Sequence, residues 1–138
     1  MNRRDLQRLS NIRLSEAKVL LDSEYYSGAY YLLGYAVECA LKACIAKQIE
    51  RHEFPNRRMV LDSYTHDLRL LLKVSGLEFE FLGEVISNPA LDRNWTTVSD
   101  WTVDSRYEYN KTEVTVREFH SAVTARANGF LPWLRRRW

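Results

Sequence analysis

The stretch AYYLLGYAVECALKACIAK, residues 29–47, decides the fold of this chain. Small and apolar residues occupy most of its positions, so a helix here has an apolar band around much of its circumference. A band this wide predicts a helix that packs against more than one neighbour. Glu38 and Lys42 lie within the band, four residues apart and in the order that favours an ion pair on one helix face.

Other segments on both sides of this stretch have helical periodicity. We predict helices over about residues 5–23, 65–75, 79–86 and 113–128, with a break at Ser27-Gly28 before the central helix. Thr65 is the expected N-cap of the third helix, Asp67 suits its first turn, and Gly76 ends it. The chain therefore reads as one all-α domain over residues 1–138, an antiparallel bundle of four to five helices.

Two segments lack this periodicity. Residues 51–64 are polar and contain Pro55, which predicts a loop. The twenty residues after Asn88-Pro89 show no clean period, although they contain Trp95 and Trp101. A short turn or helix is expected after Gly129.

Composition indicates an ordinary globular protein. The chain has 138 residues, 46% of them hydrophobic and 28% charged, which excludes a disordered chain. No apolar run approaches the length that crosses a bilayer, and the charged start does not resemble a secretory signal. We expect a cytoplasmic protein with no membrane partner.

The cysteines and histidines do not predict a metal centre. Cys39 and Cys44 are five residues apart on one helix and so lie on different faces, where they cannot form a mutual disulfide. We expect two buried free thiols. His52, His66 and His120 are scattered without zinc-site spacing, so we expect neither a metal nor a cofactor.

Positive charge gathers at both ends of the sequence. The net charge is only +2, but arginines occupy positions 3, 4, 8 and 13 and again positions 135 to 137. Such clusters can contact phosphate, and they also occur as solvated helix faces or at helix ends that favour cations.

Several segments together resemble the HEPN domains. The resemblance rests on the following residues, in family order: Ala29-Tyr30, Ala36-Val37-Glu38, Ala40-Leu41-Lys42-Ala43, His66-Asp67-Leu68 with Leu71-Leu72, Trp101 followed by Arg106-Tyr107, and Trp133-Leu134. These segments span about residues 14–134. The resemblance implies a small helical unit that handles RNA or nucleotides, is a homodimer, and is encoded in bacteria or archaea beside a nucleotidyltransferase-type antitoxin.

Catalytic HEPN members are metal-independent ribonucleases with an Arg, then four to six residues, then a His. In that chemistry Arg stabilises charge on the phosphate and His transfers a proton to or from a ribose oxygen. This chain departs from the motif. No His follows Arg106 at that spacing, Arg117 precedes His120 by only three residues, and Arg58 precedes His66 by eight.

The candidate catalytic residues are therefore Arg106, His66 and His120. Arg106 lies in a segment where structure alone does not require Arg, so it could hold phosphate, or it could pin the loop to Glu38 or Asp67. His66 could carry a proton, cap a helix or bond a neighbouring backbone group. His120 could also carry a proton, or it could pack beside Phe119.

Glu38, Lys42 and Tyr107 are the candidate ligand-binding residues. Glu38 and Lys42 could belong to a polar pocket near Arg106, or could be an ion pair that orients helices. The leading hypothesis is a protein that binds RNA, a nucleotide or a partner protein in a toxin–antitoxin or defence system. The alternatives are a metal-independent ribonuclease toxin with a non-standard Arg/His set, and a non-catalytic dimeric adaptor.

Overall fold

The computed structural model describes residues 1–51, 54 and 57–138, and these residues form helices and no strand. His52 and Pro55 lie outside the described residues. The helices are α1 (Arg3–Asp22), α2 (Tyr26–Arg51), α3 (Arg57–Asp62), α4 (Leu68–Val74), α5 (Glu78–Ser87), α6 (Pro89–Ser99), the 3-10 helix η1 (Val103–Tyr107), α7 (Glu113–Thr124) and α8 (Phe130–Arg135). The all-α prediction is confirmed, with the chain divided into more and shorter helices than four or five.

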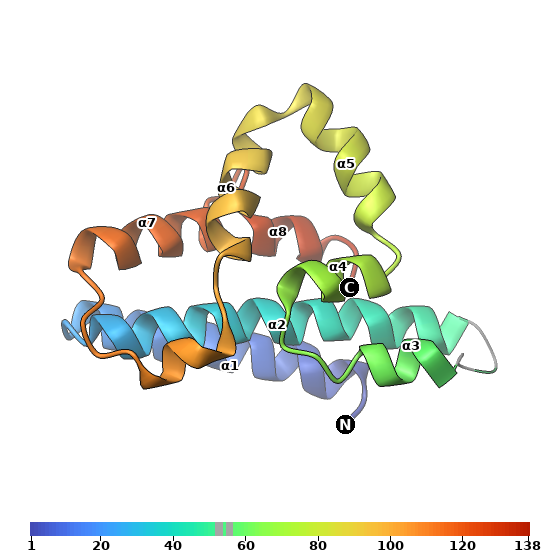
Figure 1. The fold of residues 1–138 in the computed structure, drawn as a ribbon, viewed down its shortest axis with the longest axis horizontal. Coiled ribbons are helices and arrows are strands. Elements are labelled where there is room, and N and C mark those ends of the chain that lie inside the picture. The colour runs from blue at the N-terminus through green and yellow to red at the C-terminus, as the bar shows by residue number, and fades with distance from the viewer. Residues whose placement is uncertain (52–53, 55–56) are drawn as a thin grey trace.

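Helix α2 is the centre of the fold. It runs antiparallel to α1 along the long axis, and α5 and α6 rise away from this pair (Figure 1). Helices α1, α4, α7 and α8 and the 3-10 helix η1 all pack directly against α2. The prediction that the central helix packs on several neighbours is confirmed.

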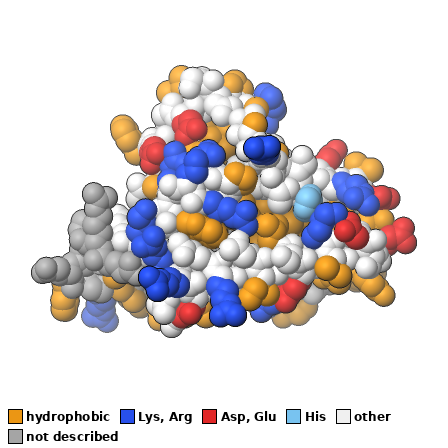
Figure 2. Space-filling view, turned by 180° about the vertical axis from the view of Figure 1, so that it is seen from behind, with side chains coloured by type: hydrophobic (Ala, Val, Ile, Leu, Met, Phe, Trp, Pro, Cys, Tyr) orange, Lys and Arg blue, Asp and Glu red, His pale blue; other side chains and the backbone are white. Residues whose placement is uncertain are grey.

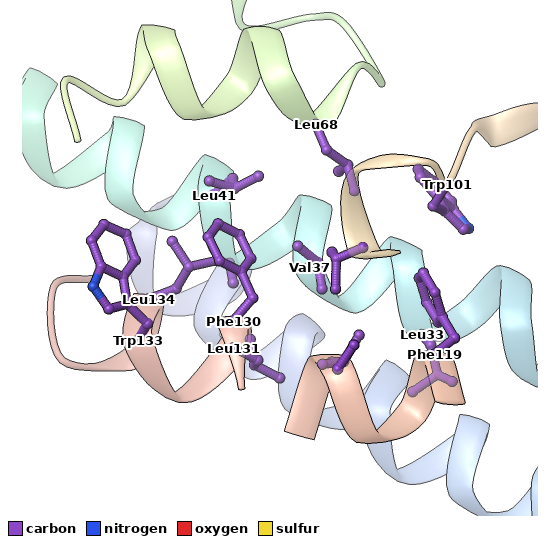
Figure 3. Packing of buried hydrophobic residues seen from close by; sticks show 14 of the residues in the cluster. Leu33, Val37, Leu41, Leu68, Trp101, Phe119, Phe130, Leu131, Trp133 and Leu134 are labelled. Carbon is purple, nitrogen blue, oxygen red and sulfur yellow. The ribbon is translucent and has the colours of Figure 1, made fainter. Parts of the chain in front are cut away.

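The apolar band of α2 forms one side of the core. Leu33, Val37 and Leu41 point from α2 into a cluster of aromatic and aliphatic side chains (Figure 3). The cluster is completed by α7 and α8, which contribute Phe119, Phe130, Leu131, Trp133 and Leu134, all nearly inaccessible to solvent. Burial of this apolar surface is the main favourable term that holds the helices together.

The turn between α1 and α2 lies earlier than predicted. Ser27 and Gly28 belong to the first turn of α2, and the break falls at residues 23–25. Glu24 adopts a φ of 67°, a left-handed conformation that only a few per cent of non-glycine residues adopt. The expected break at Ser27-Gly28 is therefore wrong, because glycine in a first helical turn is tolerated and here packs beside Leu20.

Residues 51–64, predicted as a loop, contain α3. This helix has six residues and buries none of them, so its sequence shows no apolar period. Arg58 and Asp62 lie 3.7 Å apart as an exposed i, i+4 pair, and Met59 packs at the edge of the core. A helix shorter than two turns is too short for periodicity to reveal.

The segment after Asn88-Pro89, predicted as irregular, contains α6. Asn88 is its N-cap, with Oδ1 accepting from the Leu91 amide at 3.3 Å, and Pro89 occupies the first turn. Thr96 and Thr97 disguise the helix because β-branched residues favour strands. Their hydroxyls instead donate to the carbonyls four residues earlier, at 3.0 and 3.3 Å.

Two helix boundaries also differ from the prediction. Asp67, rather than Thr65, is the N-cap of α4, since its carboxylate accepts from the amides of Arg69 and Leu70. Gly76 does follow the end of α4 and has a φ of 76°, which glycine adopts without strain. Helix α7 ends at Thr124, four residues before the predicted Asn128, where the Ala125 backbone becomes extended.

One helix is, by length and composition, long and apolar enough to cross a membrane, so the expectation that no apolar run approaches that length is wrong. The helix covers Tyr26–Ile49 of α2, and 72% of its most apolar part is buried inside the protein. The central helix of a compact helical protein passes the same test, and the packing of α2 on five neighbouring elements is of that kind.

Candidate functional site

Three of the six predicted site residues meet on α2 and the turn before α4. The Glu38 carboxylate, only 2% exposed, accepts from Lys42 Nζ at 2.8 Å. His66 Nδ1 lies 2.9 Å from Oε1 and 3.1 Å from Oε2 of the same carboxylate. The predicted Glu38–Lys42 ion pair is thus confirmed, and His66 joins it from 28 residues along the chain.

The turn before α4 holds His66 in place. The Thr65 hydroxyl accepts from the Asp67 amide at 3.1 Å, and the Asp67 carboxylate then caps α4. Leu68, the first residue of α4, is buried in the core, which anchors the turn against α2. Asp67 therefore caps α4, and the His66 side chain bonds Glu38. Among the described residues no hydrogen bond joins His66 to a neighbouring backbone group, so the alternatives that it caps a helix or bonds the backbone are wrong.

The carboxylate determines how the imidazole can act. A carboxylate only accepts hydrogen bonds, so His66 Nδ1 must donate to it. In the neutral ring Nε2 then carries the free lone pair, and in the charged ring Nε2 becomes a donor. Because the side chain is 49% exposed, Nε2 can exchange a proton with a ligand while Nδ1 stays bound to Glu38.

A groove of about 430 Å³ opens beside His66. It is lined by Thr65, His66, Asp67, Arg69, Ser99, Asp100, Trp101, Thr102 and Val103, from the turn before α4 and the end of α6 with the residues that follow it. We call it the His66 groove. Arg69 and Asp100, both on the groove lining, approach each other at 3.3 Å, and both are more than half exposed. An exposed pair of this kind contributes little to stability and can exchange partners.

Trp101 in the wall of the His66 groove packs tightly on α2. Its side chain is 2% exposed and stacks with Tyr31 at a centroid distance of 6.2 Å. A Cβ atom at Gly34 would lie 2.2 Å from the indole, so only glycine allows the ring this close. Within the described part of the chain, Trp101 Nε1 and the nearby Ser105 hydroxyl are buried without a hydrogen-bond partner, which is rare in folded proteins.

Arg106 and Tyr107 lie on η1, at the end of the segment that lines the groove. Both side chains are exposed, and the Arg106 guanidinium stacks over the Tyr107 ring at 4.8 Å. Among the described residues Arg106 forms no ion pair with Glu38 or Asp67, so the expectation that it pins the loop to either one is wrong. The 3-10 helix directs the guanidinium outward, where it is available to an anion.

His120 lies in different surroundings. It is on α7, where its neighbour Phe119 packs on Tyr30 of α2 with ring centroids 4.4 Å apart. Tyr30 lies eight residues before Glu38, which is about 12 Å along the axis of α2. Burial lowers the pKa of His120, and the nearby charges of Lys18 and Arg117 lower it further while Asp22 opposes them. The structure therefore does not bring His120 to the Glu38–His66 cluster.

The two cysteines are free and buried, as predicted. Burial raises the pKa of the Cys39 thiol to about 11 and that of the Cys44 thiol to about 12. Both therefore remain protonated near neutral pH and are poor nucleophiles. Over residues 1–51, 54 and 57–138, no three His, Cys, Asp or Glu side chains are grouped so as to hold a metal ion.

The Glu38–Lys42 pair and His66 were predicted as site residues, but not as one cluster of three. The groove residues Arg69, Asp100 and Thr102 were not predicted. No spacing rule connects positions 38 and 66, because the contact depends on how α4 packs across α2. The one available signal was that both residues fall in segments that resemble the same family.

The comparison with known proteins agrees with this structure. The family model of the HEPN domain matches residues 4–137, nearly the whole chain, whereas no curated protein and no solved structure matches. At the level of the family, the match supports a function related to nucleotides or RNA. The sequence segments, the all-α fold and the match over residues 4–137 together show that this chain belongs to the HEPN domain family.

Proposed function

We propose that this protein binds RNA or a nucleotide in the His66 groove, as a component of a prokaryotic toxin–antitoxin or defence system. The observation that carries the proposal is the hydrogen bond from His66 Nδ1 to the buried Glu38 carboxylate. It leaves Nε2 of this groove-lining residue as the ring nitrogen that can accept or donate a hydrogen bond to a ligand. A proton carrier held in this way is suited to a phosphate or ribose oxygen.

The surroundings of His66 combine the cations Lys42 and Arg69 with the Trp101 ring and the carboxylates of Asp67 and Asp100. Lys42 belongs to the cluster and Arg69 lies beside it, where its exposed pair with Asp100 is weak enough for a phosphate to compete with the carboxylate. Arg106 and Tyr107 extend the same segment with an exposed guanidinium and an exposed ring. Guanidinium groups hold phosphate bidentately and aromatic rings stack on bases.

Fluorescence titration with a short labelled RNA and with mononucleotides tests the proposal. We expect His66→Ala and Arg106→Ala each to weaken binding about tenfold, the value of one charge-assisted hydrogen bond. Arg93→Ala is the matched control, because Arg93 is exposed on α6 outside the groove. Wild-type protein that binds neither ligand at low salt, or variants that all bind like the control, would refute the proposal.

A metal-independent ribonuclease is the second candidate function. It is favoured by the same Glu38–His66 bond, since a carboxylate behind an imidazole fixes the tautomer that leaves Nε2 free to accept a proton. The expected result is RNA cleavage in the presence of EDTA that disappears in His66→Ala and persists in His120→Ala. Intact RNA after incubation with wild-type protein would remove this candidate.

We propose that the protein is a homodimer, as the family resemblance implies. A dimer could bring two copies of the site to one shared cleft, and the alternative of a non-catalytic dimeric adaptor also requires it. Size-exclusion chromatography with light scattering tests this, and a monomer counts against both. We propose that this protein is cytoplasmic and that its protein partner is a nucleotidyltransferase-type antitoxin. Co-expression with a nucleotidyltransferase encoded beside this gene should yield a stable complex, and its failure to co-purify would remove that partner.

A further inference from the structure

The fold brings the two basic ends of the sequence together. Arg3 Nη2 on α1 donates to the carbonyl of Trp138 at 3.2 Å, across 135 positions of the chain. Arg135 Nη2, at the end of α8, donates to Asn11 Oδ1 on α1 at 2.7 Å. Two clusters that the sequence places at opposite ends therefore form one surface, which we call the basic face and define by Arg3, Arg4, Arg8, Arg135 and Arg136.

Charge is strongly segregated between this surface and the rest of the protein. Residues 1–13 and 131–138 contain seven arginines and one aspartate, a formal charge of +6, which leaves the remainder of the chain at −4. Figure 2 shows Lys and Arg side chains gathered on the face seen from behind, on the side nearer the grey residues. Such segregation attracts polyanions even when the net charge is near zero.

The surface is hollowed as well as charged. One hollow of about 430 Å³ is lined by Asn2, Arg3, Arg4 and Gln7, and the neighbouring hollow shares Arg4 and Gln7 and continues along α1 to Glu16. A third, of about 400 Å³, has Lys47, Arg136 and Arg137 in its lining. Each hollow includes amide and guanidinium side chains in its lining, and these donate hydrogen bonds to phosphate and sugar oxygens.

Several of these arginines are available to a ligand. Arg4, Arg8 and Arg136 are exposed, and within the described residues none of them forms an ion pair. Arg137 differs, because Glu80 and Glu84 pair with it at 2.8 and 3.4 Å. Arg4 and Arg8 lie one turn apart on the same side of α1, so both can contact one extended chain.

We propose that the basic face binds the phosphate backbone of single-stranded RNA. It rests on the proposed function for the class of ligand, and it adds a second surface separate from the His66 groove. RNA fits better than a membrane, because an interfacial helix needs a broad apolar face and the hollows along α1 contain Ile12 as their one large apolar residue. It fits better than an acidic protein, since such interfaces depend on apolar and aromatic anchors at their centre.

Fluorescence anisotropy with a labelled oligouridine of twelve nucleotides, from 50 to 200 mM salt, tests the inference. The patch variant is Arg4→Ala/Arg8→Ala/Arg136→Ala. The control variant, Lys73→Ala/Arg93→Ala/Arg126→Ala, removes three exposed cations elsewhere and changes the net charge equally. Circular dichroism confirms that both remain folded.

We expect wild type and the control variant to lose about 18-fold more affinity over this salt range than the patch variant. That factor corresponds to three phosphate contacts on a single strand, each of which changes the logarithmic salt slope by about 0.7. A patch variant with the same salt slope as the control variant would overturn the inference.

His66→Ala in the same titration separates the two proposals. Loss of binding in His66→Ala, with an unchanged salt slope in the patch variant, overturns the basic face and supports the groove. The reverse result supports the basic face and refutes the groove. If wild-type protein does not bind the oligouridine but binds vesicles containing phosphatidylserine, the RNA assignment is wrong.

Discussion

Replacement of Gly34 by alanine tests the packing that shapes the His66 groove. Gly34 lies in the middle of α2, and three indole atoms of Trp101 lie 2.2 Å from the position of an added Cβ. Ordinary contacts of this kind are at least 3.4 Å, so the ring would have to move by more than 1 Å. Trp101 is buried and stacked on Tyr31, which leaves it little room to do so.

The magnitude follows from two opposing effects. Alanine stabilises a helix interior by about 1 kcal/mol relative to glycine. Overpacking of a rigid, buried ring costs about 3 kcal/mol, the upper part of the observed range. We therefore expect Gly34→Ala to lower the free energy of unfolding by about 2 kcal/mol.

Gly83→Ala is the matched control. Gly83 lies inside α5, and no heavy atom is within 4 Å of its Cβ position, so only the helix-propensity gain of about 1 kcal/mol applies. Urea unfolding followed by circular dichroism should place the two variants about 3 kcal/mol apart, on opposite sides of wild type.

Two results would refute this reasoning. One is stabilisation of the protein by both glycine replacements. The other is a cost of Gly34→Ala that remains in a Trp101→Leu background, where the indole is gone, because a true steric coupling must disappear in the double variant. Gly34→Ala should also weaken ligand binding in the groove, since Trp101 forms part of its wall.

Three further predictions concern stability and reactivity. Burial lowers the pKa of His120, so the unfolded chain binds its proton more readily, and this residue should reduce stability as pH falls from about 6.5 to its folded pKa. Thermal unfolding of His120→Gln between pH 7.5 and 5.5 should show a smaller decrease than wild type, and identical profiles would contradict it. Cys39, with its pKa raised to about 11, should react with iodoacetamide at pH 8 about 100-fold more slowly than in the urea-unfolded chain, and Cys44 more slowly still; similar rates by mass spectrometry would show that the thiols are accessible. Asp67→Ala should lower the free energy of unfolding by about 1 kcal/mol through loss of the α4 cap, whereas Asp67→Asn should cost much less, and equal losses would contradict a capping role.

Features that depend on one helix were predictable from the sequence. The wide apolar band of α2 and the Glu38–Lys42 pair follow from helical spacing alone, which is why the all-α fold could be predicted. Helices α3 and α6 could not be predicted in this way. Helix α3 has too few residues to show a period, and the β-branched threonines of α6 are typical of a strand. Helix α6 is stabilised by its Asn88 cap and by packing on elements elsewhere in the chain.

Contacts between distant segments required the tertiary structure. The all-α class and the ion pair on α2 are properties of residues three or four positions apart, so the order of amino acids is enough to specify them. Three contacts join residues that are 28 to 135 positions apart. They are the hydrogen bond of His66 with Glu38, the packing of Trp101 against Gly34 and the contact between the two basic ends of the chain. The physical reason is that each helix burying its apolar face on α2 also places its polar side chains. The packing of the apolar faces therefore decides which polar groups lie close together.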